Sequence, residues 1–308
     1  MVAMYKEKCT SRSEFVQVRG LGYHVRVWGT SGQLVRCPPL VLIHGWMDVA
    51  ASYQFMVDAL SDAFVDGRTI IAPDWRGFGL SGGATDSYWI PDYLADLEFL
   101  LDHYAGDQKV DLVGHSMGGN VAMVYAGVRP ERIRRLVNLE GFGLAASTPA
   151  QAPARYAKWM DQLKSLHKGD LDLKAYADIS GVAKRLMKTN PRLSMKKANW
   201  LASHWGQQDS DGQWLILGAP GHKVINANIY QVNETLEIYK CITAPVLAVE
   251  ASEDSLEKWN QGRYTLDDYH ERLKNVPNAR IAQIEDAGHM LHHDQPEQLA
   301  RMIEDFLN

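Results

Sequence analysis

Six short segments dominated by Val, Ile, Leu and Ala constrain the fold more than any other feature of the sequence. They occupy residues 40–43, 69–72, 110–113, 136–139, 245–249 and 280–284. Apolar runs of this length are typical of strands that helices cover on both faces. A seventh segment, residues 22–28 (GYHVRVW), alternates polar and apolar residues, which indicates an antiparallel edge strand.

Amphipathic helical patterns separate these segments. Residues 93–104 place leucines on one face, residues 120–128 follow a glycine-rich turn, and residues 295–307 repeat apolar side chains at helical spacing. Strand and helix therefore alternate along the chain. This alternation predicts an α/β fold with a mostly parallel sheet and right-handed crossovers.

Residues 145–240 break this alternation. The segment shows amphipathic helical patterns but no convincing buried strand, and it contains four of the nine tryptophans: Trp159, Trp200, Trp205 and Trp214. We therefore predict a core domain formed by residues 1–144 and 241–308. Residues 145–240 are predicted to form a helical cap over the carboxyl edge of the sheet.

Composition excludes several classes of function. The chain has 308 residues, 46% of them hydrophobic, and a net charge of −5, so nothing favours nucleic-acid or membrane partners. Its three cysteines form neither a disulfide framework nor a metal pattern. The N-terminus lacks the apolar core of a secretory signal, and no apolar run approaches the roughly 20 residues of a membrane span. We expect a cytoplasmic protein with a small-molecule substrate, and the sequence is compatible with a homodimer.

The sharpest chemical signal is Gly114-His115-Ser116-Met117-Gly118. It follows a predicted strand and opens a predicted helix, which is the context that a G-x-S-x-G motif requires. Glycines before and after the serine remove side chains that would collide in so tight a turn. We expect this turn to present Ser116 as a nucleophile beside a helix N-terminus that favours developing negative charge.

A serine hydroxyl needs a neighbouring base to take its proton. His289 is the candidate among eleven histidines, because it lies just beyond the last predicted strand, in a loop that can reach the sheet edge beside Ser116. His292 and His293 also suggest a metal site together with His289. They begin a helix and lack a clear ligand set, so we predict no metal there.

The carboxylate that orients the histidine is ambiguous in the sequence. Asp254 follows the segment PVLAVEAS, the usual position of this acid, and is our first choice. Glu140, at the end of LVNLE, is the rival. Glu250 and Glu253 are weaker alternatives, and the residues that do not take this role are expected in polar loops or ion pairs.

Two backbone N–H groups should stabilise the oxyanion. Met117 follows the nucleophile and supplies one of them. Trp46, in the His44-Gly45-Trp46 segment directly after the first buried run, is the candidate for the other, and its side chain is expected to line the pocket. A plain core role for the Trp46 side chain is the alternative.

The chain resembles the α/β-hydrolase superfamily over nearly its whole length, and within it the serine-hydrolase-like carboxylesterases. The matching segments, in order, are LVLIHGW (40–46), PDWRGFGLSG (73–82), DLVGHSMGG (111–119), PVLAVEASED (245–254) and DAGHMLHHDQPE (286–297). The resemblance implies an eight-stranded sheet, a helical cap and no cofactor. It places the nucleophile on Ser116, the histidine on His289 and the oxyanion donors on Trp46 and Met117.

The match has limits that bear on the chemistry. Ala251 stands where a glycine usually precedes the acid, which leaves the choice between Asp254 and Glu140 open. Dehalogenases and epoxide hydrolases of this fold use aspartate as nucleophile, so Ser116 argues against those activities. The Asp74-Trp75-Arg76-Gly77 turn matches a signature that braces the loops.

We therefore expect a serine hydrolase that cleaves carboxylic esters through an acyl-enzyme. The tryptophans of the cap favour small to medium, apolar or aromatic substrates, unless they only join cap to core. The alternatives are hydrolysis of carbon–carbon, amide or thioester bonds by the same triad, and a non-catalytic ligand receptor, because a fold does not fix a function.

Overall fold

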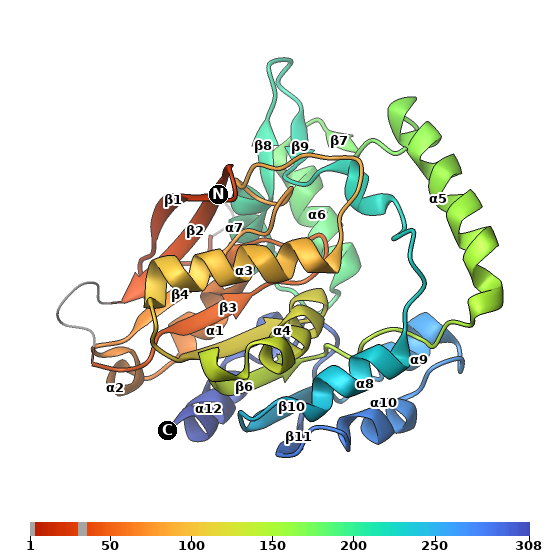
Figure 1. Ribbon diagram of the computed structural model, residues 1–308. Helices are drawn as coiled ribbons and strands as arrows, with labels where there is room; N and C mark the ends of the chain where they lie inside the picture. Colours follow the sequence, from red (N-terminus) through yellow and green to blue (C-terminus); the bar gives the residue numbers. More distant parts are fainter. Residues whose placement is uncertain (1–3, 30–35) are drawn as a thin grey trace.

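The computed structural model describes residues 4–29 and 36–308 and contains a sheet of eight strands (Figure 1). The spatial order is β1-β2-β4-β3-β5-β6-β10-β11, with β2 antiparallel to both of its neighbours and all other neighbouring pairs parallel. Their bounds are β1 Arg12–Val18, β2 Leu21–Gly29, β3 Leu40–Ile43, β4 Thr69–Pro73, β5 Val110–His115, β6 Ile133–Leu139, β10 Val246–Ala251 and β11 Ala279–Ile284. The eight-stranded, mostly parallel sheet is confirmed.

The predicted edge position of residues 22–28 is wrong. They belong to β2, which lies between β1 and β4, and β1 forms the edge of the sheet. The alternation in β2 arises because its polar residues are buried with partners. His24 Nδ1 lies 2.7 Å from Asp74 Oδ2, and Arg26 donates to Ser11 Oγ at 2.7 Å.

Continuous apolar runs are explained by two cores, one on each face of the sheet. In β3, Val41 and Ile43 join the first core, whereas Leu40 and Leu42 join the second. The first core includes side chains of α3 (Ile90–Ala105), α4 (Met117–Val128), α8 (Val232–Lys240) and α10 (Leu266–Leu273). The second includes side chains of α1 (Gln54–Ala59), α11 (Leu291–Asp294) and α12 (Pro296–Leu307). Figure 1 shows α3, α4 and α8 on the near face of the sheet.

Residues 145–240 are mostly helical, as predicted, but they also form a small antiparallel sheet. Its strands are β7 Ala175–Tyr176, β9 Trp214–Ile216 and β8 Gly206–Gln208, and they are too short for a sequence pattern to reveal. The long helices are α5 (Ala152–His167), α6 (Ile179–Thr189) and α7 (Met195–Trp205). In Figure 1, α5 stands apart from the sheet, and none of its residues is buried.

The last helix of this segment, α8, lies on the core. A Cβ placed on Gly127 of α4 would come within 2.2 Å of the Ile238 backbone oxygen, so the two helices pack at close range. The remaining short elements are η2 Ala50–Tyr53, α2 Asp62–Val65, η3 Pro130–Arg132, η4 Pro149–Gln151, η5 Pro220–Lys223 and α9 Ser255–Asn260. Every helix among residues 4–29 and 36–308 is too short or too polar to span a bilayer.

Candidate active site

Ser116 occupies a strained turn between β5 and α4. Its backbone has φ 53° and ψ −116°, a left-handed conformation that costs a non-glycine residue roughly 1–3 kcal/mol. A Cβ on Gly114 would lie 2.4 Å from the Gly118 backbone oxygen, and one on Gly118 would lie 2.3 Å from the Ile43 oxygen. Both glycines are therefore required for this turn, as the steric argument from the motif anticipates.

Helix α4 begins at Met117, directly after Ser116. The first N–H groups of a helix have no intrahelical acceptor, and the helix dipole places partial positive charge there. Met117 N–H is thus free of a helical partner directly beside Ser116. The turn fixes both the Ser116 hydroxyl and this donor through the same backbone geometry.

Ser116 and His289 line one cavity of about 390 Å³. His289 lies in the loop between β11 and α11. The loop is anchored to the strand that carries the nucleophile, because His115 Nε2 donates to the His289 backbone oxygen at 2.8 Å. The Trp259 ring packs edge-on against His289 with ring centroids 4.3 Å apart.

Glu140 is the carboxylate that faces His289. Its Oε2 lies 3.2 Å from His289 Nδ1 and also accepts from the Ser255 hydroxyl. Its Oε1 accepts from Ala251 N–H at 2.7 Å. Glu140 follows β6 with φ 55°, and only 3% of its surface is exposed. This backbone conformation and these donors hold the carboxylate in one position beneath the imidazole.

The other candidate acids have different partners. Asp254 is exposed and caps α9 by accepting from Glu257 N–H at 2.9 Å. Glu250 lies 2.7 Å from His270 Nε2, and Glu253 forms an ion pair with Arg192 at 2.5 Å. The structure therefore brings Glu140 to His289 and places our first choice, Asp254, at the start of a helix.

Burial shapes the protonation of this pair. It lowers the pKa of His289 to about 3, so the imidazole is neutral at neutral pH. Burial also raises the pKa of Glu140 to about 7, although the hydrogen bonds from Ser255 and Ala251 oppose the shift. A group with a perturbed pKa in a cavity is typical of a functional site.

Trp46 lies in the turn after β3, and no hydrogen bond of its backbone N–H occurs among the described residues. Its indole Nε1 donates to the His222 backbone oxygen at 3.1 Å, and 52% of the residue's surface is exposed. The side chain lines the cavity, so it is not a plain core residue. Trp46 thus lines the cavity that Ser116 lines, and Met117 follows Ser116 directly in the chain.

The cavity wall is mainly apolar, with few charged groups. Its apolar and aromatic members are Trp46, Met47, Leu186, Leu193, Trp205, Trp259 and Met290. Of the four tryptophans noted in residues 145–240, Trp205 lines this cavity, whereas Trp200 packs against Tyr5 and Phe55 with ring centroids 6.1 and 5.6 Å apart. Arg185 of α6 also lines the cavity.

Residues of the 145–240 segment also hold the histidine loop in place. Arg192 forms ion pairs with Glu253 and with Asp286, three residues before His289. Asn190 donates to Asp294 Oδ1 at 2.7 Å, and Lys197 donates to the His293 backbone oxygen at 2.8 Å. No sequence pattern predicts these contacts, because they join residues 61 to 104 positions apart.

The Asp74 turn braces the loops, as its resemblance to a structural signature implies. Asp74 accepts from Ala50 N–H at 2.7 Å and from Leu80 N–H at 2.9 Å. Trp75 donates its indole N–H to the His44 backbone oxygen at 3.0 Å. The turn thereby supports the segment that carries Trp46, without reaching the cavity itself.

Comparison with known proteins gives the family. A family model described as the alpha/beta hydrolase fold matches residues 38–296. The chain belongs to the α/β-hydrolase family. Two relatives and one solved structure show how varied the activities of similar proteins are. This hydrolase is 27% identical to a serine hydrolase-like protein of Danio rerio, over 92% of this chain and 84% of that protein.

A second relative carries out a different reaction. The chain is 27% identical to a cis-3-alkyl-4-alkyloxetan-2-one decarboxylase of Shewanella oneidensis, over 87% of this chain and 81% of that protein. A solved thioesterase domain from the curacin biosynthetic pathway has the same fold, with a TM-score of 0.77, 24% identity and coverage of 96% and 99% of the two chains. Family membership therefore establishes the fold of this hydrolase, whereas its reaction has to be inferred from the residues of its site.

Proposed function

We propose that this α/β hydrolase is a serine hydrolase that cleaves carboxylic esters through an acyl-enzyme. One observation carries the proposal. Ser116 and His289 line the same cavity, and the Glu140 carboxylate lies 3.2 Å from His289 Nδ1. Nucleophile, base and acid thus follow three strands of one sheet, and acyl transfer by a serine requires these three groups near one another.

In the first half of the reaction, Ser116 Oγ attacks the ester carbonyl and its proton passes to His289 Nε2. Glu140 accepts the hydrogen bond from Nδ1–H, which leaves Nε2 free to take that proton. Backbone N–H groups of Trp46 and Met117 stabilise the oxyanion. The tetrahedral intermediate collapses, and His289 returns the proton to the departing alcohol.

In the second half, His289 removes a proton from water, and the resulting hydroxide attacks the acyl-enzyme carbonyl. The carbon–oxygen bond to Ser116 breaks, and His289 protonates the serine oxygen. The carboxylic acid leaves, and both side chains return to their starting states. Glu140 stabilises the imidazolium in each half without itself transferring a proton.

We assign the acid role to Glu140 rather than to Asp254. Glu140 is buried and contacts His289, whereas the Asp254 carboxylate is exposed and binds the first turn of α9. A carboxylate is most effective in orienting an imidazole when its own position is fixed by other donors. Ser255 and Ala251 supply those donors to Glu140.

The cavity supports an apolar or aromatic acyl group of small to medium size. Trp46, Trp205 and Trp259 line it, and its volume of about 390 Å³ is at the lower end of ordinary ligand sites, which span roughly 300–1,000 Å³. We further propose that residues 145–240 act as the cap. Support comes from Leu186, Leu193 and Trp205 of this segment, which form one wall of the cavity that Ser116 enters from the core.

The test is hydrolysis of a graded set of p-nitrophenyl esters. We expect turnover of short aliphatic and aryl esters, with kcat/KM falling steeply once the acyl chain exceeds the cavity. Turnover of amide or thioester analogues with no hydrolysis of any ester would refute the ester assignment while leaving the nucleophile in place.

A second reaction class is suggested by one relative of this chain and is tested in the same assay. The decarboxylase of Shewanella oneidensis acts on oxetan-2-ones, which are cyclic esters with two alkyl substituents. Such a ring presents an ester carbonyl to an apolar cavity. Incubation with a dialkyl oxetan-2-one distinguishes the outcomes: a β-hydroxy acid as product supports ester hydrolysis, and an alkene with carbon dioxide supports decarboxylation.

A further inference from the structure

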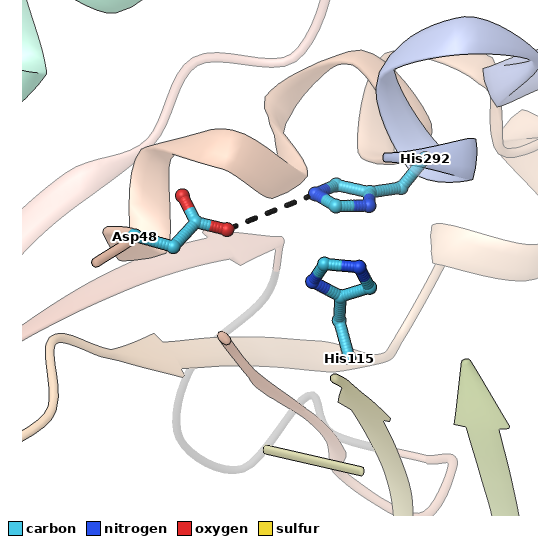
Figure 2. Close-up of side chains that lie close together, drawn as sticks. All are labelled: Asp48, His115 and His292. Carbon is cyan, nitrogen blue, oxygen red and sulfur yellow. Dashed lines mark ion pairs between the residues drawn. The ribbon is translucent and has the colours of Figure 1, made fainter. Parts of the chain in front are cut away.

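A second group of chemically reactive side chains lies immediately behind Ser116. Asp48 comes from the loop after β3, His115 ends β5, and His292 lies in α11; Figure 2 shows these side chains converging. One ligand atom from each residue lies within 4.8 Å of the others. The residues are 3%, 2% and 0% exposed, so the group is buried.

The hydrogen bonds around this group identify which lone pairs are available. His115 Nε2 contacts the His289 backbone oxygen at 2.8 Å, and a carbonyl oxygen can only accept. Nε2 therefore carries the proton, and Nδ1 presents a lone pair. Among the described residues, this Nδ1 has no hydrogen-bond partner.

The two other members also have atoms without partners. Asp48 Oδ1 accepts from Val49 N–H at 2.8 Å and from the Ser52 hydroxyl, whereas Oδ2 accepts no hydrogen bond within the described chain. Oδ2 faces His292 Nε2 at 3.9 Å, which is the contact dashed in Figure 2. Neither ring nitrogen of His292 has a hydrogen bond to the residues described. Buried polar atoms almost always have partners, so three such residues in one place require an explanation.

Two imidazoles and one carboxylate form a ligand set for a particular class of ion. Nitrogen-rich sets of this kind suit Zn²⁺, Co²⁺, Ni²⁺ and Cu²⁺, whereas Mg²⁺ and Ca²⁺ prefer oxygen ligands. His115 Nδ1 and the ring nitrogens of His292, which have no hydrogen-bond partner among the described residues, are the nitrogen ligands of this set. Asp48 contributes a carboxylate oxygen, Oδ2, as the third ligand.

We propose that Asp48, His115 and His292 bind a divalent transition-metal ion, and that the bound ion inhibits the hydrolase. This set differs from the combination of His289 with its neighbours that the sequence suggested. Three protein ligands leave one tetrahedral position for water or a substrate group. Asp48 and His115 line the cavity that contains Ser116, so an ion reaches them through the substrate entrance.

Binding requires a modest contraction of the group. Metal–nitrogen bonds of about 2.0–2.1 Å place two tetrahedral ligand atoms about 3.4 Å apart. The ligand atoms now lie within 4.8 Å of one another. Side-chain rotations that move each atom by about 1 Å would bring them to the spacing that a bound ion needs. His115 directly precedes Ser116 and its Nε2 binds the His289 carbonyl, so movement of this ring toward an ion disturbs both neighbours.

Inhibition follows from that connection and from charge, and this half of the inference rests on the proposed function. His289 must become positive during acyl transfer. The His115 and His289 ring centroids are 4.7 Å apart, so an ion on His115 Nδ1 places two positive charges close to the developing imidazolium. Repulsion at this range in a buried site disfavours the charged ring.

The experiment measures binding and activity separately. The metal-free enzyme, prepared with a chelator, is titrated with Co²⁺ and with Zn²⁺ by calorimetry, and the Co²⁺ complex is examined for the visible absorption of a tetrahedral ion. The variants are Asp48→Asn and His292→Phe. The control is His167→Phe, because His167 and Asp86 form an exposed pair at 3.5 Å that would bind metal adventitiously.

We expect one ion per chain, with the dissociation constant raised about tenfold or more in Asp48→Asn and His292→Phe and unchanged in His167→Phe. Zn²⁺ should inhibit ester hydrolysis in the wild type and in His167→Phe, and the two ligand variants should resist it relative to their own metal-free rates. Equal affinity in all four proteins, or no stoichiometric binding, would overturn the proposal. Both ligand variants are checked for native circular dichroism. Stoichiometric, variant-sensitive binding by a protein without esterase activity would refute the proposed function and retain the metal site.

Discussion

The carboxyl ends of the core strands and the 145–240 segment contribute to the same cavity in different ways. Ser116, Glu140 and His289 follow the carboxyl ends of β5, β6 and β11, and backbone strain or buried hydrogen bonds fix each of them. The 145–240 segment supplies apolar wall and touches the histidine loop through side chains such as Arg192. Its helix α5 buries no residue at all. Under the proposed function, the chemistry depends on residues fixed by the backbone of the sheet, and the substrate preference depends on the less buried segment.

This division predicts that changes at the carboxyl ends of the strands abolish the reaction, whereas changes in the 145–240 segment alter which substrate reacts. The largest effect is expected for Ser116→Ala, which removes the nucleophile. Its kcat should fall by about 10⁴-fold or more, measured with a p-nitrophenyl ester under saturating conditions. Native circular dichroism serves as the folding control. Retention of more than a few per cent of the activity would exclude Ser116 as nucleophile.

The next effect compares two isosteric changes, Glu140→Gln and Asp254→Asn. Loss of the acid in a triad lowers kcat by about 10²- to 10⁴-fold, so Glu140→Gln should lose activity on this scale. Asparagine caps a helix about as well as aspartate, so Asp254→Asn should keep both activity and stability within about twofold and 0.5 kcal/mol. A larger loss in Asp254→Asn than in Glu140→Gln would reverse the assignment of the acid.

The pH profile should follow the same pair. His289, with its pKa lowered to about 3, is neutral throughout the neutral range, whereas Glu140, with its pKa raised to about 7, takes up a proton as the pH falls through 7. The protonated acid no longer stabilises the imidazolium, so kcat/KM should decline below about pH 7 and reach a plateau above it. Initial rates between pH 5 and 9 measure this, and Glu140→Gln should lack the transition. A wild-type profile that is flat down to pH 5 would contradict this account.

The raised pKa of Glu140 also predicts that stability falls with rising pH, whereas activity rises. Its pKa in the folded protein lies above its ordinary value of 4.5, so the folded state holds this proton more tightly than the unfolded chain. The stabilising contribution is complete below pH 4.5 and is lost as the pH rises through about 7. The difference in unfolding free energy between wild type and Glu140→Gln, measured by urea denaturation, should therefore favour the variant more at pH 8 than at pH 5. A pH-independent difference would show that the pKa of Glu140 is not raised.

The smallest effect is expected in the 145–240 segment. Trp205→Leu removes part of the cavity wall, and it should change the ranking of aryl over aliphatic esters about three- to tenfold through KM, with kcat for the smallest ester nearly unchanged. The matched control is Trp159→Leu, because Trp159 lies in α5 and outside the cavity wall. Equal shifts in both variants would mean that the aromatic residues act on stability and not on the substrate.

Features that depend on residues close together in the sequence could be predicted, and features that depend on distant residues could not. Apolar runs and the glycines around Ser116 act within a few residues, so the sheet and the nucleophile turn were predictable. Strand β1 (RSEFVQV) was not predicted because it is the outermost strand of the sheet and is largely polar and solvent-exposed. Because β1 was missed, β2 was wrongly predicted to be the outermost strand.

Non-local features were out of reach for the same reason. The contact of Glu140 with His289 depends on a positive φ after β6 and on the register that brings Ala251 N–H to the carboxylate. Neither is visible in the residues around position 140, whereas Asp254 has a conventional place after a strand. Likewise, Asp48, His115 and His292 meet only because β3, β5 and α11 converge.

The most direct test of the central claim is labelling by a fluorophosphonate, which reacts with a serine only when a base and an oxyanion site activate it. The adduct is located by mass spectrometry of peptides from the wild type and from Glu140→Gln. The account predicts one adduct per chain on Ser116, formed at least about tenfold more slowly in Glu140→Gln. No adduct on Ser116, or an adduct formed at equal rates in both proteins, would contradict the triad of Ser116, His289 and Glu140.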